Sequence, residues 1–114
     1  MAEREVAVKE EIKRSIEYLS RRFRIKEVVL FGSQLAREVD EYSDIDLIVI
    51  SPDFEGMKYD EILNVFAETA LRCGSRVEFH PYAEKDLLNA RPANFLGYAL
   101  KTGKVVFRDN KLEI

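Results

Sequence analysis

The sequence predicts an α/β (α+β) fold in which helices pack on a small central sheet. Segments with apolar residues at helical spacing alternate with short apolar segments rich in β-branched residues. No internal repeat, low-complexity tract or linker rich in Gly, Pro and Ser interrupts this alternation. We therefore expect one domain over residues 1–114, with a parallel or mixed sheet covered by helices.

The first half of the chain is expected to supply the first helix and the first two strands. The apolar spacing predicts a helix over residues 3–22. The segment 27–31 is short, apolar and β-branched, which is typical of a buried strand, and a short helical turn is expected over 34–37. Residues 43–50 predict a second strand that is polar at its start and buried thereafter.

The second half of the chain is expected to give three more helices and two more strands. A long helix is predicted over residues 58–73, followed by a strand over 76–80. Two short helices are predicted over 83–89 and 94–101, and a last strand over 105–107. The apolar face of the long helix is expected to consist of Ile62, Leu63, Phe66, Ala67, Ala70 and Leu71. The predicted order is αβαβαβααβ.

Composition and charge narrow the classes of function. The 18 Lys and Arg residues against 21 Asp and Glu residues give a net charge of −3, so long nucleic acids and membranes are not expected as partners. No segment approaches the roughly 20 apolar residues of a membrane-spanning helix, and the N-terminus has no apolar signal, so a soluble cytoplasmic protein is expected. Cys73 is the single cysteine and is expected to be a buried, inert thiol.

Two carboxylates are placed close together at the start of the second strand. Because strand side chains alternate between faces, Asp44 and Asp46 project to the same side, about 6.5–7 Å apart along the strand. Converging carboxylates beside a core need a cation or protons, and oxygen ligands of this type suit Mg²⁺ and Mn²⁺. The alternative is that Asp44 caps a turn and Asp46 is solvated at the strand edge.

Gly32 and Ser33 follow the first strand and precede the expected helical turn. Glycine lets a phosphate approach the backbone closely, while the serine hydroxyl and the helix start offer hydrogen-bond donors. The alternative is that Ser33 only caps the helix. The combination of this segment with the paired aspartates is what indicates a site for a phosphate and its counter-cation.

The segment LFGSQLAREVDEYSDIDLIVIS, residues 30–51, contains Gly-Ser, a gap, and Ser-Asp-Ile-Asp-Leu. In this it resembles the minimal nucleotidyltransferase (MNT) family of the DNA polymerase beta-like nucleotidyltransferase superfamily, of the MntA-like antitoxin type. The N-terminal helix, a later strand with a third carboxylate, and the closing segment ALKTGKVVF extend the resemblance over nearly the whole chain. The resemblance implies a polymerase beta-like nucleotidyltransferase fold.

The resemblance also implies a third metal ligand on a later strand, for which Glu78 in RVEFHPY is the candidate, although Asp is commoner there. The alternative is an exposed Glu78 paired with Arg76. His80 shares the face of Glu78 and could contact a nucleotide or a metal, or be a hydrogen-bonded residue at the strand end. Arg37 stands where the family usually has Gly, so a turn of different shape is expected there.

The activity that the resemblance implies is transfer of a nucleoside monophosphate from an NTP, most often ATP, to a hydroxyl, with release of pyrophosphate. Gly32 and Ser33 would hold phosphates of the nucleotide. Asp44 and Asp46, with Glu78, would be catalytic and would hold two Mg²⁺ ions, with Mn²⁺ as a substitute.

The partner that the resemblance implies is a HEPN-type toxin protein, whose hydroxyl would be the acceptor. A second hypothesis is a non-catalytic, nucleotide-binding antitoxin subunit that neutralises the toxin. An antibiotic-modifying enzyme is disfavoured because 114 residues leave no room for a domain that holds the sugar. A homodimer or a hetero-oligomer is expected on analogy.

Overall fold

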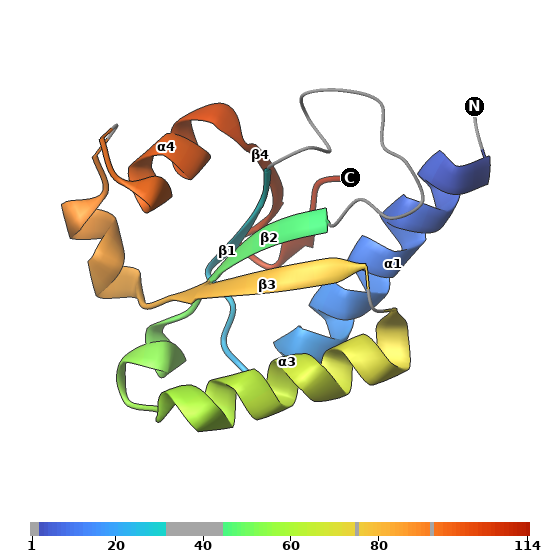
Figure 1. The fold of residues 1–114 in the computed structure, drawn as a ribbon, viewed down its shortest axis with the longest axis horizontal. Coiled ribbons are helices and arrows are strands. Elements are labelled where there is room, and N and C mark those ends of the chain that lie inside the picture. Colours follow the sequence, from blue (N-terminus) through green and yellow to red (C-terminus); the bar gives the residue numbers. More distant parts are fainter. Residues whose placement is uncertain (1–2, 32–44, 75, 92) are drawn as a thin grey trace.

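The computed structural model describes residues 3–31, 45–74, 76–91 and 93–114. In these residues, five strands form one sheet in the order β3-β2-β1-β4-β5 (Figure 1). Their bounds are Glu27–Phe31 for β1, Ile45–Ile50 for β2, Val77–Tyr82 for β3, Lys104–Arg108 for β4 and Lys111–Leu112 for β5. β2 runs parallel to β3, while the other neighbouring strands are antiparallel. The predicted α/β class with a small mixed sheet is confirmed.

Helices cover both faces of the sheet (Figure 1). The two long helices, α1 (Glu3–Ser20) and α3 (Tyr59–Cys73), pack with the sheet in one apolar core. The shorter α4 (Phe95–Thr102) packs on the opposite face in a second core, which the 3₁₀ helix η2 (Glu84–Asn89) completes. A further 3₁₀ helix, η1 (Pro52–Glu55), follows β2.

β2 lies near the middle of the sheet and is buried on both faces along most of its length. Ile45, Leu47 and Val49 belong to the core under α1 and α3, while Ile48 and Ile50 belong to the core under α4. This explains the unbroken apolar run that the sequence showed, because a strand covered on both faces does not need polar residues at alternate positions.

The face that α3 buries differs in part from the prediction. Its buried side chains are Ile62, Phe66, Thr69 and Cys73. Three residues assigned to the apolar face lie on the exposed side instead, namely Leu63, Ala67 and Leu71. The apolar residues of this helix spread over more than one face, so their spacing alone could not select the face that meets the sheet.

Several element boundaries also differ from the prediction. β3 continues through Pro81 to Tyr82, which is possible because β3 is an edge strand and proline lacks only a donor there. Residues 84–89 form a 3₁₀ helix rather than an α-helix. η1 and β5 were not predicted. β5 forms a hairpin with β4 through Asp109 and Asn110, which both have positive φ angles, of 53° and 64°.

Cys73 is buried, as predicted, at the end of α3. Burial raises the pKa of its thiol, so the reactive thiolate form is disfavoured. No helix in the described ranges is both long and apolar enough to cross a membrane.

Candidate metal and nucleotide site

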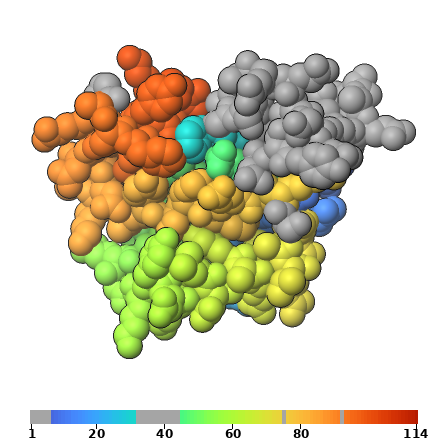
Figure 2. All heavy atoms as spheres, in the orientation of Figure 1, coloured from blue at the N-terminus to red at the C-terminus, as the bar shows by residue number. Residues whose placement is uncertain are grey.

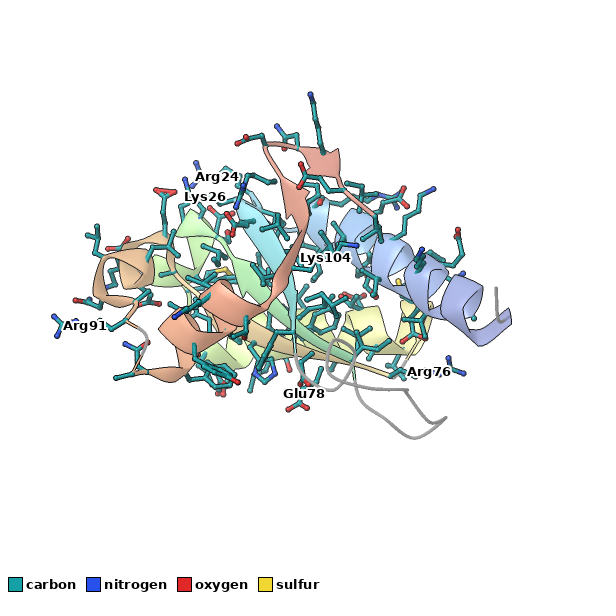
Figure 3. All side chains as sticks on the ribbon, turned by 90° about the horizontal axis from the view of Figure 1, so that it is seen from above. Arg24, Lys26, Arg76, Glu78, Arg91 and Lys104 are labelled. Atoms are coloured by element: carbon teal, nitrogen blue, oxygen red, sulfur yellow. The ribbon has the colours of Figure 1, made fainter. Side chains whose placement is uncertain are left out.

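Three strands place their side chains in one row across the sheet. Phe31 at the end of β1 pairs with Asp46 in β2, and Asp46 pairs with Glu78 in β3. Residues directly opposite in neighbouring strands share a face, so the two carboxylates lie side by side. Figure 3 shows Glu78 on the opposite side of the molecule from Arg24 and Lys26.

His80 joins this row from the next position on the same face of β3. Its Nε2 lies 3.1 Å from Oδ1 of Asp46, within hydrogen-bond distance. The side chains of Asp46 and His80 are 22% and 26% exposed, whereas Glu78 is exposed. His80 is therefore a hydrogen-bonded residue inside the strand rather than at its end, since β3 continues to Tyr82.

The three side chains form a set of metal-ligand atoms. Asp46, Glu78 and His80 each offer one such atom, and these atoms lie within 4.8 Å of one another. Carboxylate oxygens suit hard divalent cations, and an imidazole nitrogen suits transition metals. The chemistry of this donor set fits a divalent cation. In the described ranges, no Lys or Arg side chain forms an ion pair with either carboxylate.

A buried carboxylate from α1 holds the start of β3 in place. Glu11 is 7% exposed, and its Oε2 accepts a hydrogen bond of 3.0 Å from the backbone N–H of Arg76. The carbonyl of Arg76 accepts a bond of 2.8 Å from the N–H of Ile45, the first residue of β2. These bonds fix β3 beside β2, and they set the register that brings Glu78 opposite Asp46.

The sequence matches the family model described as polymerase beta, nucleotidyltransferase, over residues 13–112. The chain belongs to this family. Members of the polymerase beta nucleotidyltransferases usually work with divalent metals, and the Asp46, Glu78 and His80 cluster offers donors for one.

A solved structure supports the fold of this nucleotidyltransferase. The chain is similar to the crystal structure of a candidate nucleotidyltransferase from Sulfolobus solfataricus, with a TM-score of 0.61 and 16% sequence identity. The alignment covers 95% of this chain and 92% of the other, so it extends over almost the whole fold. Among curated proteins, none matches the sequence significantly.

The structure brings together two of the five residues predicted for the site of this nucleotidyltransferase, Asp46 and Glu78. The other three, Gly32, Ser33 and Asp44, lie outside the described residues, as do Arg37 and the helical turn expected over 34–37. Glu78 is exposed, as the alternative interpretation required, but its pairing with Arg76 is not among the ion pairs of the described residues.

Aromatic residues beside the cluster are the part of the site that the sequence analysis missed. The ring centroids of Phe31 and Phe95 lie 6.2 and 5.7 Å from that of His80, and 5.1 Å from each other. Atoms from the end of β1 and the start of β2, teal and green in Figure 2, reach the surface between α4 and β3. The signal for Phe31 was its place at the end of the apolar run of β1, directly before Gly32 and Ser33. Phe95 comes from α4 and had no local signal.

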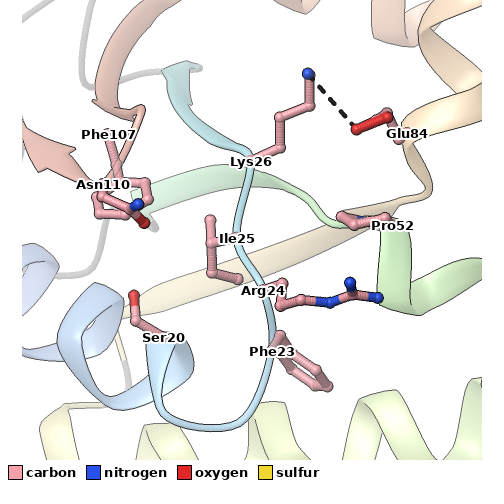
Figure 4. A pocket seen from close by; sticks show the side chains of 9 residues that line it. All are labelled: Ser20, Phe23, Arg24, Ile25, Lys26, Pro52, Glu84, Phe107 and Asn110. Atoms are coloured by element: carbon pink, nitrogen blue, oxygen red, sulfur yellow. Dashed lines mark ion pairs between the residues drawn. The ribbon is translucent and has the colours of Figure 1, made fainter.

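A separate hollow of about 440 Å³ lies beside the opposite end of β1 (Figure 4). Its two cations already have partners: Arg24 pairs with Asp53 at 2.6 Å, and Lys26 pairs with Glu84 at 3.5 Å. Among the described residues that line it, Glu84 is the single carboxylate. Among the described residues, the candidate site is therefore the Asp46 end of the sheet rather than this hollow.

Proposed function

We propose that this nucleotidyltransferase moves AMP from ATP to a hydroxyl of an acceptor and releases pyrophosphate. The observation that supports this most is the pairing of Asp46 with Glu78 across adjacent parallel strands, in a chain that matches the family over residues 13–112. A protein with a purely structural sheet has no physical reason to place two carboxylates side by side, because like charges on neighbouring strands destabilise the pair.

Each predicted residue has a role in this proposal. Asp46 and Glu78, together with Asp44, hold divalent cations, Mg²⁺ or Mn²⁺, with two ions as the expected number. Gly32 and Ser33 hold phosphates of the nucleotide through backbone N–H groups and the serine hydroxyl. Divalent cations bound in such a site stabilise the charge on the entering and leaving oxygens of an in-line displacement.

The proposal requires that ATP binding depends on a divalent cation. The triphosphate and the carboxylates of Asp46 and Glu78 repel each other when no cation lies between them. Calorimetry with ATP should therefore detect binding with Mg²⁺ present and little or none in EDTA. Equal affinity in the two conditions would remove the metal from the proposal.

The proposed acceptor is a hydroxyl on a HEPN-type protein partner. The net charge of −3 gives no surface that attracts a polynucleotide. α3 also presents an apolar surface to solvent, the exposed α3 row: Tyr59, Leu63, Ala67 and Leu71, of which Leu71 is 88% exposed. Apolar residues gathered on one exposed helix face support a protein partner.

A labelling experiment tests the reaction and the acceptor together. The protein is incubated with Mg²⁺, the candidate partner, and ATP labelled on either the α- or the γ-phosphate. Transfer of AMP labels the partner only from the α-labelled ATP, whereas a kinase would label it only from the γ-labelled ATP. Asp46→Asn should remove the label, and Asp109→Asn, at an exposed turn between β4 and β5, should keep it. Label on tRNA or an aminoglycoside, with none on the partner, would contradict the protein acceptor.

The second candidate function is a non-catalytic antitoxin subunit, which the exposed α3 row favours because it needs only a binding surface. Under this alternative, Asp46→Asn still neutralises the toxin, whereas Leu63→Glu weakens the complex. Asn64→Glu is the matched control, because Asn64 is exposed but lies beside the row. Loss of neutralisation in Asp46→Asn with an intact complex would favour the enzyme.

A further inference from the structure

We propose that His80 is itself a metal ligand, and that Asp46, Glu78 and His80 together select a divalent transition metal, Mn²⁺, over Mg²⁺. The inference rests on the proposed function only in placing a divalent cation at Asp46. What it adds is a nitrogen ligand and a metal preference that the two carboxylates alone would not produce.

The distances suit this assignment. Ligands about 2.1 Å from an octahedral ion lie about 3 Å apart when they are neighbours and about 4.2 Å apart when they are opposite. Nε2 of His80 and Oδ1 of Asp46 are 3.1 Å apart, which matches neighbouring ligands. The full set of donor atoms lies within 4.8 Å, and Glu78, as the exposed member of the set, is the side chain that has to turn toward the other two.

The donor chemistry favours a transition metal. Mg²⁺ is usually held by one or two carboxylates, water and substrate phosphates, and it has little preference for imidazole. Imidazole nitrogen is a commoner ligand of first-row transition metals than of Mg²⁺, and Mn²⁺ is the member of that series whose preference for carboxylate oxygens and water is nearest to that of Mg²⁺. Two carboxylates with one imidazole therefore match Mn²⁺ better than they match Mg²⁺.

The ring of His80 is held in position before any metal arrives. Phe31 from β1 and Phe95 from α4 both lie against it, at centroid distances of 6.2 and 5.7 Å. Restricting the ring in this way lowers the entropy lost when its nitrogen binds a metal. A hydrogen-bonded His80 that only orients Asp46 is the competing arrangement, and it leaves the cation with oxygen ligands alone.

Isotope labelling can separate the two arrangements, because His80 is the only histidine in the chain. Protein made with ¹⁵N-histidine and without a histidine tag carries the label at this position alone. Electron–nuclear double resonance of bound Mn²⁺, with and without ATP, should show a ¹⁵N coupling typical of direct ligation. Bound Mn²⁺ without that coupling would overturn the inference and leave the proposed function standing. Failure to bind Mn²⁺ in either condition would also overturn the inference, whereas the proposed function would fall only if ATP bound equally well with Mg²⁺ and in EDTA.

Metal affinities give a second, independent measurement. His80→Gln keeps a polar side chain that can still hydrogen-bond Asp46, but it removes the imidazole. We expect calorimetry to show Mn²⁺ affinity reduced by at least about tenfold, with Mg²⁺ affinity little changed. Glu84→Gln, at the opposite end of the molecule, should change neither. An equal loss of affinity for Mn²⁺ and Mg²⁺, or no loss for either ion, would contradict a nitrogen ligand. The ¹⁵N experiment uses the unmodified sequence, so it does not depend on whether His80→Gln folds.

Discussion

In the part of the chain that the structure describes, helices cover one face of β2 along its whole length and the other face only in part. Under α1 and α3, Ile45, Leu47 and Val49 are fully buried, whereas on the α4 face Ile48 and Ile50 are fully buried and Asp46 is not. A carboxylate can occupy the start of this strand because the cover of α4 ends before it, since a fully buried unpaired charge would be very costly. The closed face stabilises the sheet, and the open end of the other face is where charged groups can meet a ligand.

Asp46→Asn tests the open end and should have the largest effect, the loss of nucleotidyl transfer. Asparagine keeps the shape of the side chain and the hydrogen bond with His80, but it removes one charge from a repulsive pair. The free energy of unfolding should therefore stay the same or rise slightly. The measurements are the transfer rate and the urea midpoint, with Asp109→Asn as the control. Normal turnover would exclude Asp46 from the mechanism, and a large loss of stability would assign it a structural role.

Leu47→Ala tests the closed face at the next residue of the same strand. Leu47 is fully buried between the sheet and the two long helices, so its truncation leaves a cavity. The expected loss is about 2–5 kcal/mol in the free energy of unfolding. Leu88→Ala is the control, because Leu88 is 87% exposed and its truncation should change stability by less than about 0.5 kcal/mol. A loss at Leu47 no greater than at Leu88 would contradict the comparison of the faces.

The sequence predicted the fold where the local signal was strong. β1 and β2 were recognised from their apolar, β-branched runs and α1 from its spacing, because burial on a defined face imposes these patterns. β5 has two residues, too few to show any alternation. Its turn did have a signal, since Asp109 and Asn110 are residue types that tolerate positive φ, but it was not used.

The candidate site was predictable only in part. Spacing placed Glu78 and His80 on one face of their strand, and the family resemblance suggested that this strand meets Asp46. The register that sets Asp46 opposite Glu78 depends on parallel pairing with β3, which local patterns do not determine. Phe95 reaches His80 because α4 folds back over the sheet, and that contact follows from tertiary packing alone.

Gly74→Ala tests the connection between α3 and β3, which lies on the closed face of the sheet, the face that α1 and α3 cover. Gly74 has a φ of +133°, which side chains disfavour, and an added Cβ would lie 2.3 Å from Cδ of Glu11. We expect a loss of about 1–3 kcal/mol. Gly56→Ala is the matched control, since its φ is −98° and nothing lies within 4 Å of the added atom. Equal urea midpoints for the two variants would show that this connection tolerates a side chain.

The smallest expected change in stability comes from replacing Asp53. Unlike Asp46, this carboxylate already has a cation, Arg24, as its partner. Its oxygens accept hydrogen bonds of 2.8 Å from Nε and from the backbone N–H of Arg24. The hydrogen bonds from the Arg24 side chain, then the one from its backbone, lower the pKa of the Asp53 carboxyl.

The pKa of Asp53 is lower in the folded protein than in the unfolded chain, so the ionised carboxylate stabilises the fold. This stabilisation is present above the ordinary carboxyl pKa, near 4, and is lost as the pH falls through the folded pKa. Asp53→Asn should therefore cost less than about 1 kcal/mol at pH 7, because the pair is partly solvated, and its difference from the unmodified protein should shrink toward pH 3. Urea midpoints at the two pH values measure this, with Asp109→Asn as the control, because Asp109 is exposed and is in no ion pair of the described residues. A difference that stayed constant between pH 7 and pH 3 would mean that Asp53 acts through the shape of its side chain. In that case the contrast between Asp53 and Asp46 would lie in packing rather than in charge.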